Sequence, residues 1–114
     1  MTEKTDKVKK IRKIDTKPWM EGDELCRIVH KTKDLMFGFS FMNPGTKGNI
    51  DQGHESGEEV FWVAKGYLLL HLPEQNEYYE AEEGEALVVS PGVPHQFFNP
   101  SDKVSIIAWA LAPA

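Results

Sequence analysis

The chain has 114 residues, of which 40% are hydrophobic and 27% charged, and its formal net charge is −5. This length is enough for one domain with a single core. The sequence lacks an apolar run near the ~20 residues that a membrane-spanning helix needs, and its charged start is unlike a signal peptide. The single cysteine, Cys26, cannot form an internal disulfide. We therefore expect a cytoplasmic protein without a membrane partner, and we interpret Cys26 as a small core residue rather than a nucleophile.

Charge is unevenly distributed along the chain. Residues 1–17 hold seven Lys or Arg and three Asp or Glu, whereas the remaining residues are strongly acidic. An acidic body repels nucleic acid, so we expect no nucleic-acid partner. We predict that residues 1–17 form a flexible basic N-terminal tail and that residues 18–114 form a single domain. The alternatives are that the basic tail binds nucleic acid or an anionic membrane surface, or that it docks on an acidic neighbouring subunit.

From Glu24 onward the sequence is typical of short strands separated by turn signals rich in Gly and Pro. A helical period is absent except for a weak one in the tail. Many short strands with such turns predict an all-β fold, an antiparallel sandwich or jelly roll. The predicted strands are 24–31, 35–42, 50–54, 59–65, 67–72, 77–82, 86–89, 95–98 and 103–111.

Two of these segments, 68–70 and 106–111, are apolar on both faces. A strand of this kind must be covered on both sides. One face can meet the core of a small sandwich, and a second copy of the chain is the expected cover for the other. The pattern predicts a homodimer.

The segment 51–66, read DQGHESGEEVFWVAKG, concentrates candidate metal ligands. Side chains alternate along a strand, so Gln52 and His54 would share one face of the predicted strand. Glu59 opens the next strand, and His95 follows a Pro-bounded turn. One amide, one carboxylate and two imidazoles suit a divalent Mn, Fe, Co, Ni or Zn ion.

The spacing of these residues resembles the motifs of the cupin superfamily. Six residues separate Glu59 from Gly66, and four separate His54 from Glu59, as in the first cupin motif. The second cupin motif is matched by count at Gly84, Gly92, His95 and Asn99.

The resemblance covers roughly residues 35–111 and has three departures. Gln52 stands where the family has its first motif histidine. Gly45 lies one residue too far from the motif, and Ser90 takes the place of the motif proline, with Pro91 beside it. The resemblance implies a small single-domain cupin, that is, a double-stranded antiparallel β-helix or jelly-roll barrel that commonly dimerises.

The resemblance also implies one divalent metal held by Gln52, His54, Glu59 and His95. Gln52 is open to three interpretations: a fourth ligand, a neighbour of the ligands, or a sign that the metal is lost. Glu59 would be the only charged ligand. A divalent ion would then keep positive charge and favour an anionic or polyhydroxylated small molecule.

Aromatic residues are expected to wall the pocket. Phe61, Val63 and Phe97 alternate in phase with the predicted ligands. In the segment 35–42 the phenylalanines alternate with small residues, and we also place Phe39 and Phe41 in the pocket wall.

His30 is the candidate catalytic base. It shares strand parity with Cys26 and Ile28, which would place it inside the barrel if those two are core residues. A hydrogen-bonded or surface histidine is the alternative.

Three functions remain open from the sequence. The first is a metal-dependent enzyme of isomerase, lyase or dioxygenase type that acts on an oxygen-rich organic acid or sugar. The second is a non-catalytic ligand-binding or sensor protein. The third is a metal-free structural barrel that only dimerises.

Overall fold

The computed structural model describes residues 7–114 and contains ten strands in two sheets. The strands are β1 (Pro18–Glu21), β2 (Glu24–Lys31), β3 (Met36–Met42), β4 (Thr46–Lys47), β5 (Glu58–Lys65), β6 (Tyr67–Leu72), β7 (Glu77–Glu82), β8 (Ala86–Val89), β9 (Gln96–Asn99) and β10 (Ser105–Ala112). The described helical structure is one 3-10 turn at Lys13–Asp15. No helix within residues 7–114 is long and apolar enough to cross a membrane.

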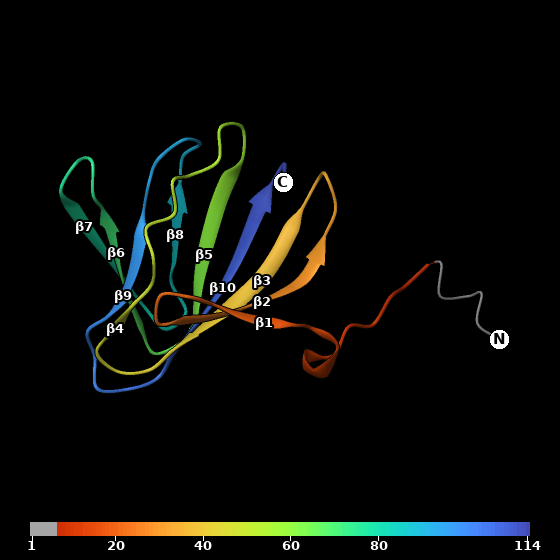
Figure 1. Ribbon diagram of the computed structural model, residues 1–114, viewed down its shortest axis with the longest axis horizontal. Coiled ribbons are helices and arrows are strands. Elements are labelled where there is room, and N and C mark those ends of the chain that lie inside the picture. The colour runs from red at the N-terminus through yellow and green to blue at the C-terminus, as the bar shows by residue number, and fades with distance from the viewer. Residues whose placement is uncertain (1–6) are drawn as a thin grey trace.

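The two sheets form an antiparallel jelly roll (Figure 1). The larger sheet has the order β1-β2-β3-β10-β5-β8, and the smaller sheet has the order β4-β9-β6-β7. After β3 the chain crosses repeatedly between the sheets, from β3 to β4, β4 to β5, β5 to β6, β7 to β8, β8 to β9 and β9 to β10. The predicted all-β jelly-roll class is confirmed.

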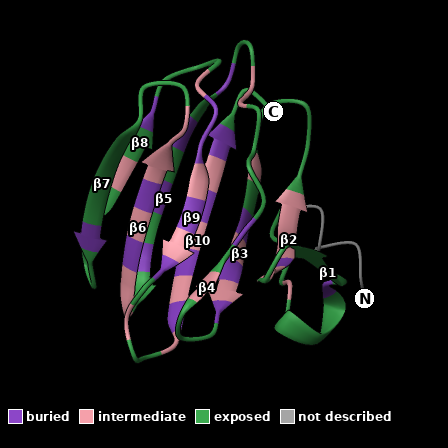
Figure 2. Ribbon diagram, turned by 60° about the vertical axis from the view of Figure 1, so that its left-hand side comes forward, coloured by how far each residue is buried: buried purple, intermediate pink, exposed green. Residues whose placement is uncertain are grey.

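The core lies between the sheets and follows strand alternation. Figure 2 shows buried bands along several strands, whereas β7 is mostly exposed. Phe61 on β5 pairs with Trp109 on β10, and Val63 pairs with Ile107, so these buried side chains face the same layer. Cys26 is also buried, and burial raises the pKa of its thiol to about 12. That keeps the thiol protonated and agrees with a core role.

Strand β3 has the orientation opposite to the one predicted. Gly38 pairs with Trp109, and Ser40 pairs with Ile107, so the small residues face the core. A Cβ atom at position 38 would overlap the Trp109 ring, which explains why the face of β3 with the small residues lies inward. Phe39 and Phe41 therefore lie on the outer face and do not wall the pocket.

His30 also lies on the outer face, because the β2–β3 ladder is irregular. Ile28 pairs with Gly38, but the next pair joins His30 to the exposed Phe37. The extra residue between them reverses the strand parity after Ile28. The parity argument that placed His30 inside the barrel was therefore wrong.

The predicted strand 50–54 does not form. Figure 1 shows the chain passing from β4 to β5 as a loop, in which Asp51 makes only an isolated bridge to His95. Gly53 has φ +87°, which interrupts an extended backbone. Strands β1 and β4 were not predicted, since β4 has only two residues and the strand pattern was taken to begin at Glu24.

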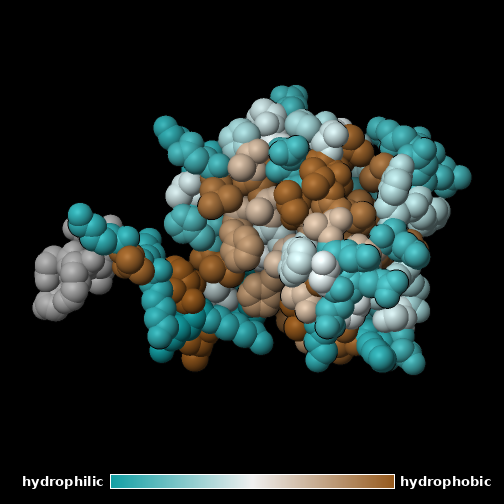
Figure 3. Space-filling model, turned by 180° about the vertical axis from the view of Figure 1, so that it is seen from behind, coloured by the Kyte–Doolittle hydropathy of each residue, from teal (hydrophilic) through white to brown (hydrophobic). Residues whose placement is uncertain are grey.

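The outer face of the larger sheet is apolar. Trp62 and Val88 are 48% and 62% exposed, and Phe37 and Val60 lie on the same side. The view from behind in Figure 3 shows apolar atoms gathered in the middle of the molecule, with hydrophilic atoms around them.

At the edge of this sheet, Arg27 Nη1 donates to the carbonyl of the buried Thr16 at 3.0 Å, which ties the segment before β1 to β2.

Candidate metal centre

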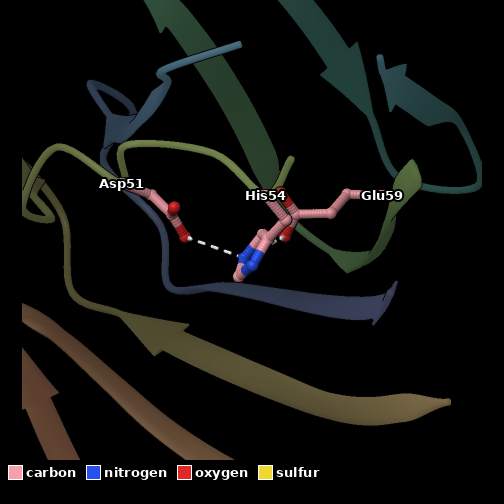
Figure 4. Close-up of side chains that lie close together, drawn as sticks. All are labelled: Asp51, His54 and Glu59. Atoms are coloured by element: carbon pink, nitrogen blue, oxygen red, sulfur yellow. Dashed lines mark ion pairs between the residues drawn. The ribbon is translucent and has the colours of Figure 1, made fainter. Parts of the chain in front are cut away.

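Asp51 enters the site through a backbone bridge between two loops. Its amide nitrogen donates to the carbonyl of His95 at 2.7 Å, and its carbonyl accepts from the amide of His95 at 2.9 Å. The Asp51 side chain then forms a local turn, because its Oδ1 accepts from the Gly53 amide at 2.8 Å. That bond fixes the carboxylate so that Oδ2 faces His54 (Figure 4) and also His95.

The same loop positions His54. Its carbonyl accepts a hydrogen bond from the Gly92 amide at 2.8 Å, which ties the loop to the turn between β8 and β9. Gly53 packs so closely against Val93 that a Cβ atom would lie 2.9 Å from the Val93 backbone nitrogen and oxygen. His54 Nε2 lies 3.9 Å from Asp51 Oδ2 and 3.9 Å from Glu59 Oε2.

Glu59 projects from β5 toward the core side of the larger sheet. It pairs with the buried residues Val89 and Leu111, and it is itself only 7% exposed. Burial is the main reason why the pKa of Glu59 rises to about 7, and the negative charges of Asp51 and Glu24 add to it. A buried carboxylate with this pKa is most favourable when a cation neutralises it.

His95 is held in one tautomer. Its Nδ1 lies 2.9 Å from the carbonyl oxygen of Val93, which can only accept, so Nδ1 carries the proton. Nε2 then faces the carboxylates, at 3.3 Å from Glu59 Oε1 and 3.8 Å from Asp51 Oδ2. A metal-binding histidine commonly has this arrangement, in which a carbonyl orients the ring.

The donor atoms have the spacing that one metal ion requires. The candidate atoms of Asp51, His54 and Glu59 all lie within 4.8 Å of one another. Ligands about 2.1 Å from an ion are roughly 3.0 Å apart at right angles and 4.2 Å apart on opposite sides. The four separations between an imidazole Nε2 and a carboxylate oxygen, 3.3 to 3.9 Å, fall in this range. Two imidazoles and two carboxylates fit a divalent Mn, Fe, Co, Ni or Zn ion.

Gln52 does not join this cluster. The residue is exposed and does not line the cavity, and Asp51 presents its side chain instead. The predicted convergence of His54, Glu59 and His95 is present in the structure. The sequence argument missed Asp51 because it treated the loop as a strand. The Asp-x-Gly pattern at residues 51–53, which favours a turn closed by the aspartate side chain, was the available signal.

The cluster lies in a cavity of about 350 Å³ between the sheets. Of the predicted pocket residues, Phe61 and Phe97 line this cavity, whereas Val63 is fully buried and lies elsewhere in the core. Trp109 also lines the cavity. The wall additionally contains Trp19, Glu21 and Glu24, which the sequence argument did not place there.

Known structures with the same fold were found, although no curated protein matches the chain. KdgF from Halomonas sp. is 19% identical, and the match covers 93% of this chain and 94% of that one with a TM-score of 0.76. The polyketide cyclase RemF from Streptomyces resistomycificus is 17% identical, with 94% and 80% covered and a TM-score of 0.74. An uncharacterised double-stranded β-helix protein from Klebsiella pneumoniae is 20% identical, with 92% and 90% covered and a TM-score of 0.76.

These structural matches show the fold alone, since their identities are low. The family description "Cupin domain" matches residues 38–110, which is more than half of the chain. The chain belongs to the cupin domain family.

Proposed function

We propose that the protein is a divalent-metal-dependent enzyme that acts on an oxygen-rich small molecule in the cavity. The observation that carries the proposal is the convergence of four side chains at the wall of that cavity, where Nε2 of His54 and Nε2 of His95 each lie 3.3 to 3.9 Å from a carboxylate oxygen of Asp51 and of Glu59. Such a set leaves positions on a six-coordinate ion for a substrate.

A bound divalent ion would supply Lewis acidity toward a substrate oxygen. The protein side chains orient the ligands and exclude water from the cavity. His95 is fixed by Val93, and Asp51 is fixed by the Gly53 amide, so two of the ligands are oriented before any ion binds. Phe61, Phe97 and Trp109 give the cavity apolar walls that exclude water from the substrate.

The family and the fold neighbours support this proposal. One neighbour is a polyketide cyclase, so the same barrel occurs in an enzyme. The reaction class for this chain is proposed to be isomerase, lyase or dioxygenase chemistry. A non-catalytic, metal-dependent binding protein is the competing reading of the same site.

Metal content tests the proposal. Protein purified without a metal-affinity tag from metal-supplemented medium is expected to carry roughly one divalent ion per chain, and His54→Ala is expected to lose it. Wild-type protein with no more metal than His54→Ala would refute the proposal. Turnover of a panel of keto and hydroxy compounds by the metal-loaded protein then distinguishes an enzyme from a binding protein.

A further inference from the structure

The cavity beside the candidate metal centre is lined by acidic groups. Four carboxylates contribute to its wall, and among the residues that the structure describes no lysine or arginine does. Asp51 and Glu59 belong to the candidate ligands, and their two charges offset those of a divalent ion. Glu21 and Glu24 remain as additional negative charge. This arrangement differs from the expected centre with a single carboxylate, which would have kept positive charge.

Glu24 is the more enclosed of these two residues, and hydrogen bonds fix its carboxylate. The Ser40 hydroxyl donates to Glu24 Oε2. Ser40 Oγ in turn accepts from the indole Nε1 of Trp109 at 2.8 Å. Because the Trp109 indole can only donate, the Ser40 hydroxyl proton is free to point at Glu24. Trp109 and Glu24 both line the cavity, so this chain of bonds forms part of its wall.

Gly48 leaves the space that the Glu24 carboxylate occupies. A Cβ atom at position 48 would overlap Glu24 Oε1. Gly48 does not have the positive φ that would require glycine for backbone reasons. The Glu24 carboxylate is therefore held between Gly48 on one side and Ser40 on the other.

We propose that Glu24 is the specificity-determining residue of the cavity: its carboxylate disfavours anionic ligands relative to neutral ligands of the same shape. This inference rests on the proposed function, because it concerns a ligand that binds beside the metal. A carboxylate with limited access to water repels a nearby anion more strongly than a solvated one does.

Three ligands of the same shape and different charge test the inference. Oxalate carries two negative charges, oxamate carries one, and oxamide is neutral. Their affinities for the metal-loaded protein are measured by calorimetry at pH 8 for wild type and for Glu24→Gln, which retains an acceptor for Ser40. Loss of the charge is expected to tighten oxalate binding by roughly tenfold and oxamate by about threefold, and to leave oxamide nearly unchanged.

Two further variants and the metal content complete the experiment. Glu74→Gln removes the same charge from an exposed turn outside the cavity and should change none of the three affinities. Gly48→Ala should displace the Glu24 carboxylate and change the oxalate affinity without changing the net charge. If the protein carries metal but Glu24→Gln leaves oxalate binding unchanged, or shifts all three ligands equally, this inference alone is refuted. If the wild type carries no metal, the proposed function fails, and this inference fails with it.

Discussion

Asp51 and His95 exchange both of their backbone hydrogen bonds although they belong to different loops. The bridge places a carboxylate from the loop before β5 against an imidazole from the turn before β9, with Nε2 and Oδ2 3.8 Å apart. The geometry of the candidate metal centre therefore depends on backbone contacts between the loops as well as on the side chains of the candidate ligands.

Gly53→Ala is expected to damage the centre through the backbone. Alanine at φ +87° is strained, and its Cβ would lie 2.9 Å from the Val93 backbone. The displaced loop should weaken metal binding by about tenfold or more, measured by competition with a chelator. Gly84→Ala is the matched control, because Gly84 has φ +85° but no atom within 4 Å of the new Cβ. Equal metal affinity in the two variants would contradict the account.

Asp51 and Gln52 should differ sharply when each is replaced by alanine. Asp51→Ala removes a candidate ligand and should lower metal affinity by more than the roughly 10–100-fold typical of residues that only support ligands. Gln52→Ala should lower it by less than about twofold, since Gln52 is exposed and away from the cavity. Dissociation constants from chelator competition provide the comparison. A larger loss of metal affinity in Gln52→Ala than in Asp51→Ala would instead identify Gln52 as a ligand.

The positions of His54, Glu59 and His95 could be predicted because motif spacing fixes which residues occupy strand ends and turns. The loop and bulge residues could not be predicted in this way. Gly53 turns the backbone where alternation assumed a strand, and the irregularity between Ile28 and His30 reverses the parity. Each feature shifts the alternation of inward and outward side chains by one residue. The pattern of hydrophobic residues in the sequence does not reveal such a shift.

The orientation of β3 was mispredicted for a different reason. The larger residues of that strand were taken as the pocket wall, but the ring of Trp109 fills the space above Gly38. Only the pairing of β3 with β10, which is distant in sequence, reveals this. The fold class was recoverable from local pattern, whereas the inward face of this strand depended on a partner that local pattern does not identify.

Glu59 should make the metal-free protein less stable as the pH rises. Its folded-state pKa of about 7 lies above its usual value of 4.5, so the folded state binds the proton more tightly than the unfolded state. The contribution of Glu59 to the free energy of unfolding is therefore lost as the pH rises from about 4.5 to 7. Glu59→Gln should raise the melting temperature at pH 8 by roughly 5 °C and change it little at pH 4.5. Melting curves in the presence of a chelator test this. A variant equally stabilised at both pH values would contradict it.

We propose that a second copy of the chain covers the apolar outer face of the larger sheet. Trp62 lies on this face, together with Phe37, Val60 and Val88. Trp62→Lys should shift the mass measured by light scattering from dimer to monomer, because a charge would have to be buried in the interface. Tyr78→Lys on β7, which belongs to the smaller sheet, should leave the mass unchanged. A monomeric mass for dilute wild-type protein would refute the proposed dimer.

The most direct test of the account is a crystal structure of the metal-loaded wild type, with diffraction data collected at the absorption edge of the bound metal. The account predicts one anomalous peak within about 2.3 Å of Asp51 Oδ2, His54 Nε2, a Glu59 oxygen and His95 Nε2. The absence of such a peak, or a peak bound by Gln52 with the Asp51 side chain turned away, would contradict it.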